Sequence, residues 1–129
     1  MQKLNVTEIN KTDEKYVVAC KHTLSEEEIQ GIKAGERMLV DSDGLAFVYI
    51  LEDASQFYYL AFEQNSWSEL YEAYKTQLPL VVELGNNHLI ELFQLHDELD
   101  YLLENIEGNS NYGEELETAV REVFLKTVE

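Results

Sequence analysis

The chain has 129 residues, of which 45% are hydrophobic and 11% aromatic, and it carries a formal net charge of −17 at pH 7. Its length is that of one domain with one hydrophobic core, and it shows neither a signal peptide nor an apolar run of the roughly 18 residues needed to cross a bilayer. Because a strong negative field repels nucleic-acid phosphates and anionic lipids, we expect neither direct nucleic-acid binding nor membrane binding.

The amino-terminal part predicts a hairpin followed by a short helix. Apolar residues roughly alternate with polar ones over 4–9, and the β-rich segment 16–20 follows a polar break, as in two strands joined by a turn. Ser25 and Glu28 have the spacing of a capping box, which marks the start of a helix. We expect Gly31 to end that helix after a turn or two.

Three apolar segments at 37–40, 45–51 and 57–62 are separated by polar turns, which predicts a three-stranded meander. Segment 45–51 is apolar at every position instead of alternating. That pattern is typical of a strand buried on both faces, so we expect it to be central in the sheet and covered on each side.

Residues 66–77 predict a helix, since Ser66 and Glu69 form a second capping-box pattern and apolar residues recur at helical spacing. The segment 80–92 then predicts a second hairpin around the turn Gly85-Asn86-Asn87, whose residue types favour tight turns.

From Leu95 the period of apolar residues changes to that of an amphipathic helix, and 116–124 predicts a final helix after the loop 105–113. The pattern therefore predicts an α+β fold. We expect a mainly antiparallel sheet of about seven strands, in hairpins and a meander, packed by three helices plus one short helix. All of it should form a single α+β domain over residues 1–129.

Cys20 is the only cysteine, so the chain forms no internal disulfide. A reducing cytoplasm is therefore the expected location. Between apolar neighbours, this side chain is expected to be a small buried residue and not a reactive thiol.

The acidic charge lies mostly in the second part of the chain. Residues 1–40 hold six Lys or Arg and seven Asp or Glu, which leaves −16 on residues 41–129. On the helix that starts near Leu95, one stripe opposite the apolar face is acidic. It consists of Asp97, Asp100, Glu104 and Glu107.

Such a stripe is commonly the solvated side of an amphipathic helix, but it also suits docking of a basic protein partner. Tyr112 lies in the loop 105–113, which is rich in Asn and Gly. This loop is either a simple connector between helices or a recognition loop that carries the tyrosine.

Asp41, Asp43 and Glu52 are the weak candidates for a cation site, because they match three positions of an EF-hand loop. The fifth and sixth positions of that loop are Leu45 and Ala46, which lack the required ligand and glycine. We therefore expect a polar hairpin turn, no metal site, no catalytic residue and no cofactor.

Two stretches of the sequence are MLVDSDGLAFVYILE at 38–52 and HDELDYLLENIEGNSNYG at 96–113. In these stretches the chain resembles the YjbL-like family of small uncharacterised proteins from Bacillus and Staphylococcus relatives. The resemblance implies a cytoplasmic protein of Gram-positive bacteria. It carries over no activity and no site residues.

The leading functional hypothesis is a non-enzymatic protein-interaction or regulatory module that uses its acidic C-terminal half. Its partner would be a protein with a basic surface, or a second copy of the chain. Two alternatives remain open at this point. One is a small-ligand or metal-dependent enzyme, and the other is a nucleic-acid mimic that inhibits a DNA-binding protein.

Overall fold

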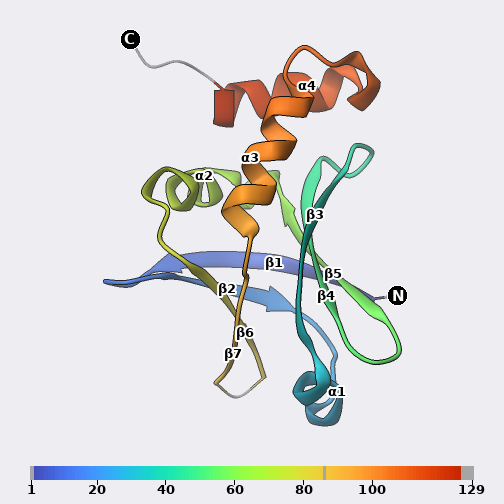
Figure 1. Ribbon diagram of the computed structural model, residues 1–129, viewed down its shortest axis with the longest axis vertical. Coiled ribbons are helices and arrows are strands. Elements are labelled where there is room, and N and C mark those ends of the chain that lie inside the picture. The colour runs from blue at the N-terminus through green and yellow to red at the C-terminus, as the bar shows by residue number, and fades with distance from the viewer. Residues whose placement is uncertain (1, 86, 126–129) are drawn as a thin grey trace.

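The computed structural model describes residues 2–85 and 87–125, which form a strongly curled seven-stranded sheet with helices packed against it (Figure 1). The strands are β1 (Gln2–Lys11), β2 (Tyr16–Lys21), β3 (Lys33–Asp41), β4 (Ala46–Glu52), β5 (Phe57–Glu63), β6 (Leu80–Leu84) and β7 (His88–Glu91). The helices are α1 (Glu26–Gly31), α2 (Trp67–Thr76), α3 (Leu95–Ile106) and α4 (Glu114–Val120), with short turns η1 (Gln64–Ser66), η2 (Ser110–Tyr112) and η3 (Arg121–Leu125). The predicted fold class is confirmed.

The order of the strands is β3-β4-β5-β1-β2-β6-β7. The hairpin β1-β2 occupies the middle, the meander β3-β4-β5 extends one side and the hairpin β6-β7 extends the other. Neighbours within a hairpin or meander pair antiparallel, whereas β1 with β5 and β2 with β6 pair parallel. The sheet is therefore mainly antiparallel. The turn predicted at 85–87 joins β6 and β7, but its residue Asn86 lies outside the described residues.

Strand β4 was expected at the centre of the sheet, and this expectation is only partly right. It is an interior strand with partners on both sides, but β1 holds the middle position. It is buried on both faces, as its composition predicts, with Phe47 0% exposed on one face and Val48 3% exposed on the other. Sequence composition reports burial, whereas strand order depends on long-range pairing that composition does not encode.

A bulge explains the irregular apolar spacing of β1. The register with β2 shifts between Val6 and Glu8, so Thr7 has no partner residue, and its hydroxyl donates to the carbonyl of Ala19 at 3.2 Å. An extra residue in one strand reverses which side chains point inward. Val6 and Ile9 therefore both face the core, although they are three positions apart.

Strand β3 begins at Lys33, four residues earlier than predicted. A bulge interrupts the alternation of apolar and polar residues by which the start of a strand is recognised in the sequence. The register with β4 shifts between Ala34 and Met38, and Glu36 within the bulge has a positive φ of 60°. A Cβ atom on Gly35 would lie only 2.7 Å from the carbonyl oxygen of Ile50. The glycine is therefore required by the close approach of two strands.

The two predicted capping boxes have different outcomes. At α1, the Ser25 hydroxyl accepts from the Glu28 backbone N–H and the Glu28 carboxylate accepts from the Ser25 N–H, so this box is confirmed. At α2 the prediction is wrong, because the Ser66 hydroxyl donates to the carbonyl of Glu63 at 2.8 Å and caps no helical N–H. The turn η1 runs into α2 and replaces the cap.

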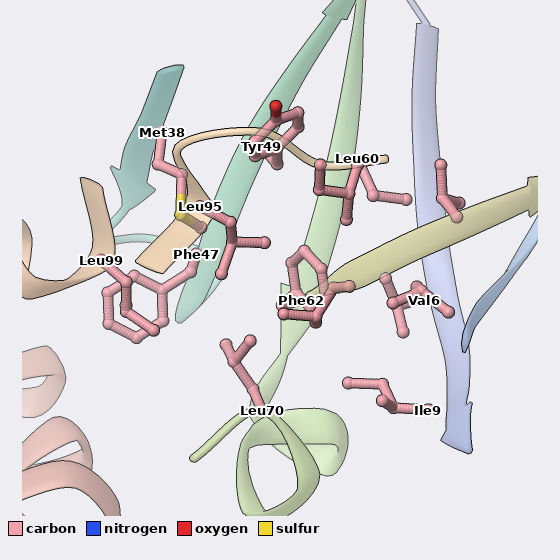
Figure 2. Packing of buried hydrophobic residues seen from close by; sticks show 14 of the residues in the cluster. Val6, Ile9, Met38, Phe47, Tyr49, Leu60, Phe62, Leu70, Leu95 and Leu99 are labelled. Atoms are coloured by element: carbon pink, nitrogen blue, oxygen red, sulfur yellow. The ribbon is translucent and has the colours of Figure 1, made fainter. Parts of the chain in front are cut away.

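The main core lies inside the curl of the sheet, between the strands and the helices α2, α3 and α4 (Figure 2). Phe47, Leu60 and Phe62 point into it from β4 and β5, and Leu70 and Leu99 meet them from α2 and α3. Alternation along the strands and helical spacing along α3 supply these side chains. None of the helices in the described residues is long and apolar enough to cross a membrane.

Helix α3 closes the open side of the curled sheet. Its Glu98 carboxylate accepts from the backbone N–H of Met38 on the edge strand β3 at 3.0 Å. The Tyr49 hydroxyl donates to the carbonyl of Phe93 at 2.7 Å, and His96 Nε2 lies 2.7 Å from the carbonyl oxygen of Leu78. These contacts fix the start of α3 and thereby the orientation of its acidic side.

Candidate functional site

The candidate site is the outward side of α3. Asp97, Asp100, Glu104 and Glu107 are all exposed there, at helical spacing along one stripe that we call the acidic face. Within residues 2–85 and 87–125, the ion pairs join Lys3 to Glu63, Lys75 to Glu72, and Arg121 to Glu117. None of them involves the acidic face, so its charge is not neutralised by the part of the chain that the structure describes.

Three of these four carboxylates border a groove of about 180 Å³, which lies between α2, α3 and η3. Its apolar side is built from Leu103, Phe124 and Leu125. The polar side carries Asp100, Glu104, Glu107 and the Tyr74 hydroxyl. An apolar floor beside carboxylates suits a long cationic side chain, whose methylenes pack on the floor while its charged end meets the acids.

One hydrogen bond organises this groove. The Tyr74 hydroxyl donates to Asp100 Oδ1 at 2.5 Å and thereby joins α2 to α3. Burial first, and then the bond to this carboxylate, raise the pKa of Tyr74 to about 12. The phenol therefore stays protonated at neutral pH and holds Asp100 in place, while the second carboxylate oxygen has no partner among the described residues.

Tyr101 adds a large aromatic side chain beside the acidic face. It lies one turn from Asp97 and from Glu104 on α3, and it is 65% exposed. Exposed tyrosine offers apolar area together with a polar end, which is why it is enriched in protein interfaces. Sequence reasoning missed Tyr101, although its position outside the apolar stripe of α3 already indicates an outward direction.

Tyr112 lies on η2, where it is half-buried and packs against the main core. Its loop is held by local bonds. The Gly108 N–H donates to Glu117 Oε2 at 2.9 Å, and the Asn111 N–H donates to Asn109 Oδ1 at 2.9 Å. These contacts anchor the loop as a connector between the helices. Because Tyr112 is half-buried, only part of its side chain is accessible to a partner.

The weak cation candidates do not come together. Asp41 and Asp43 lie at the β3-β4 turn, where Asp41 Oδ1 accepts from the Gly44 N–H at 3.0 Å. Glu52 lies at the opposite end of β4, which is about 20 Å away at roughly 3.3 Å per residue. Among the described residues no group of three or more His, Cys, Asp or Glu is placed to hold a metal ion.

Two further residues of the groove, Tyr74 and Phe124, were predicted only as general helix or core positions. Their roles depend on how α2 and η3 pack against α3, and no local pattern carries that information. The predicted acidic residues are found together because α3 holds Asp97, Asp100 and Glu104, and Glu107 directly follows as the residue that caps its carboxyl end.

The fold and this surface define a small acidic α+β protein with an open groove that has an apolar floor and an acidic border. A model for a family of unknown function (UPF0738) matches residues 4–124, and the chain belongs to this family.

Relatives match over almost the whole chain. The UPF0738 protein YjbL of Bacillus subtilis (strain 168) is 47% identical over 114 residues, which cover 88% of this chain and 90% of that protein. A UPF0738 protein of Bacillus thuringiensis (strain Al Hakam) is 42% identical over 123 residues, or 95% and 98% of the two chains. A third, from Shouchella clausii, is 40% identical over 124 residues, or 96% and 100%. The resemblance inferred from sequence is thus confirmed for Bacillus and its relatives. No solved structure matches the chain significantly.

Proposed function

We propose that this protein is a non-enzymatic interaction module of the cytoplasm, which docks a basic segment of a partner protein on its acidic face. The observation that carries the proposal is the groove beside α3, where an apolar floor lies against Asp100, Glu104 and Glu107. A lysine or arginine of the partner would lay its methylenes on Leu103 and Phe124.

Tyr101 supports this role, since an exposed aromatic side chain beside a charged surface contributes contact area at low conformational cost. The carboxylates then give specificity for a basic partner and speed up its association through the field of the −17 chain. Binding is therefore expected to weaken as salt screens this field.

A nucleic-acid mimic has less support. The four carboxylates of the acidic face span ten residues, or about 15 Å of helix axis at 1.5 Å per residue. One DNA strand places a phosphate about every 3.4 Å along its axis, so a matching row would need more charges over that length. Docking of a protein segment fits the observed spacing better.

The test compares three versions of the chain in binding to cytosolic proteins and to a fluorescent peptide that carries several lysines. The first is the wild type. The second neutralises the acidic face with Asp97→Asn, Asp100→Asn, Glu104→Gln and Glu107→Gln. The third is a matched control with the same change in charge at exposed acids elsewhere, namely Glu8→Gln, Asp13→Asn, Glu14→Gln and Glu27→Gln.

We expect the wild type and the matched control to retain one specific partner, and the acidic-face variant to lose it together with most of its affinity for the peptide. Tyr101→Ala should weaken binding of the natural partner more than binding of the peptide. If both variants lose binding equally, net charge alone explains the interaction. If both retain it, the acidic face is not the docking surface.

A further inference from the structure

A small hollow lies where the edge strand β3 meets the start of α3, which packs alongside that strand (Figure 1). Its volume is about 260 Å³, and it shares no residue with the groove beside the acidic face. One cation, one carboxylate and four apolar or aromatic side chains line it. They are Arg37, Glu98, Leu39, Ile50, Phe57 and Tyr59.

Arg37 brings to this hollow a positive charge that forms no ion pair in the part of the chain that the structure describes, although the sequence has 26 Asp and Glu. Its guanidinium stands over the Phe57 ring, 5.5 Å from the ring centre. A guanidinium in this position uses its flat face, so the N–H groups around its edge stay free to donate to a carboxylate.

Glu98 brings the opposite charge from the side of α3. Its Oε1 accepts from the Met38 N–H at 3.0 Å, which holds the half-buried side chain in one position. Its Oε2 has no hydrogen-bond partner among the described residues. Arg37 and Glu98 thus line one hollow without forming an ion pair with each other, so each can bind a different charge of a single ligand.

The rest of the lining suits a hydrocarbon group. Ile50 is 4% exposed and Tyr59 is half-buried, whereas Leu39 and Phe57 are exposed by 37% and 42%. An aliphatic side chain that enters the hollow leaves water and covers these apolar surfaces. The hollow therefore combines two separated opposite charges with an apolar wall.

Size and charge narrow the class of ligand. At about 30 Å³ for one water, the volume of about 260 Å³ has room for roughly nine atoms of that size, which corresponds to leucine or isoleucine. A zwitterion has no net charge, so the field of the −17 chain does not repel it as it repels a simple carboxylate. A simple amine would leave the Arg37 guanidinium without an acceptor.

We propose that this hollow binds a free aliphatic amino acid of the size of leucine. The Arg37 fork donates to the α-carboxylate, and Glu98 Oε2 accepts from the α-ammonium group. The aliphatic side chain lies against Ile50 and Tyr59. This binding does not involve the acidic face, so failure of either proposal leaves the other intact.

An NMR titration of the ¹⁵N-labelled full chain with leucine, up to about 50 mM, tests the proposal. The backbone amide signals of Arg37, Leu39 and Tyr59 should shift saturably with a Kd of about 1 mM, because an open hollow buries only part of a small ligand. Three analogues each lack one feature of leucine. Leucinamide lacks the carboxylate, 4-methylpentanoate lacks the ammonium group and glycine lacks the side chain, so each should bind at least about tenfold more weakly.

Two variants test the charged residues. Arg37→Gln and Glu98→Gln should each weaken leucine binding at least about tenfold. Glu98→Gln keeps an oxygen that accepts from the Met38 N–H, so the fold is retained. Lys33→Gln and Glu8→Gln are the matched controls, since each removes one exposed charge outside the hollow, and both should bind leucine as the wild type does.

Three results would each overturn the proposal. They are a wild type without saturable shifts, an analogue that binds as tightly as leucine, and controls that lose as much binding as Arg37→Gln and Glu98→Gln.

Discussion

Phe124 on η3 ties the carboxyl-terminal helices to the core, and its replacement gives a direct measure of that attachment. Its ring is 5% exposed and makes edge contacts with three others, at centroid distances of 5.3 Å to Phe47, 5.6 Å to Trp67 and 5.7 Å to Tyr71. A buried Phe→Ala change costs about 3–5 kcal/mol, and aromatic pairs contribute about 0.5–1.5 kcal/mol each beyond burial. Because three pairs are lost, we expect Phe124→Ala to cost about 4 kcal/mol.

The assay is urea unfolding followed by the fluorescence of Trp67, the only tryptophan, which is fully buried beside Phe124. In thermal unfolding followed by the same fluorescence, a loss of about 4 kcal/mol should lower the Tm by about 15 °C in a chain of this size. Phe124→Leu should lose less, since it keeps most of the apolar volume.

Tyr101→Ala is the matched control for removal of an aromatic ring. Tyr101 is 65% exposed, so its loss should stay within about 0.5 kcal/mol of the wild type. If Phe124→Ala also costs less than about 1 kcal/mol, then η3 frays without unfolding the rest, and the groove beside α3 would have no fixed floor.

Two further predictions concern titratable groups. The hydroxyl of Tyr58 and the backbone N–H groups of Ser55 and Gln56 hold the pKa of Asp53 to about 2, below the roughly 3.9 of an unfolded chain. The ionised Asp53 carboxylate therefore stabilises the fold above about pH 4, and this contribution is lost as the pH falls toward 2. In urea titrations, Asp53→Asn should be less stable than the wild type at pH 7 and equally stable near pH 2. Burial raises the pKa of the Cys20 thiol to about 11, so alkylation at pH 8 should run roughly 100-fold slower in the folded protein than in urea, and comparable rates would contradict the burial.

The parts of the fold that follow from local pattern were predictable from the sequence. The apolar period of α3, the all-apolar β4 and the capping box at Ser25 each encode their own structure. The bulges in β1 and β3 were not predictable, because each depends on the partner strand that it faces. The same holds for the parallel pairs, which join segments far apart in the chain.

The acidic face was predictable because one helix carries it, but the groove beside it was not. Tyr74 and Phe124 come from other elements, and only packing brings them to Asp100 and Glu104. The candidates Asp41, Asp43 and Glu52 show the converse case. Their spacing matches a calcium-binding EF-hand loop, which lies between two helices. In this protein the extended strand β4 separates Glu52 from Asp41 and Asp43.

The central place of the amino-terminal hairpin also sets when the protein can fold during its synthesis. Gln2 pairs with Tyr58 and Tyr16 with Leu80, so both sides of β1-β2 stay unpaired until most of the chain has left the ribosome. Exposed strand edges invite pairing with other nascent chains, and long-range contacts of this kind form slowly. Four lysines lie along this hairpin, namely Lys3, Lys11, Lys15 and Lys21. Their charges help to keep the still unpaired strands soluble.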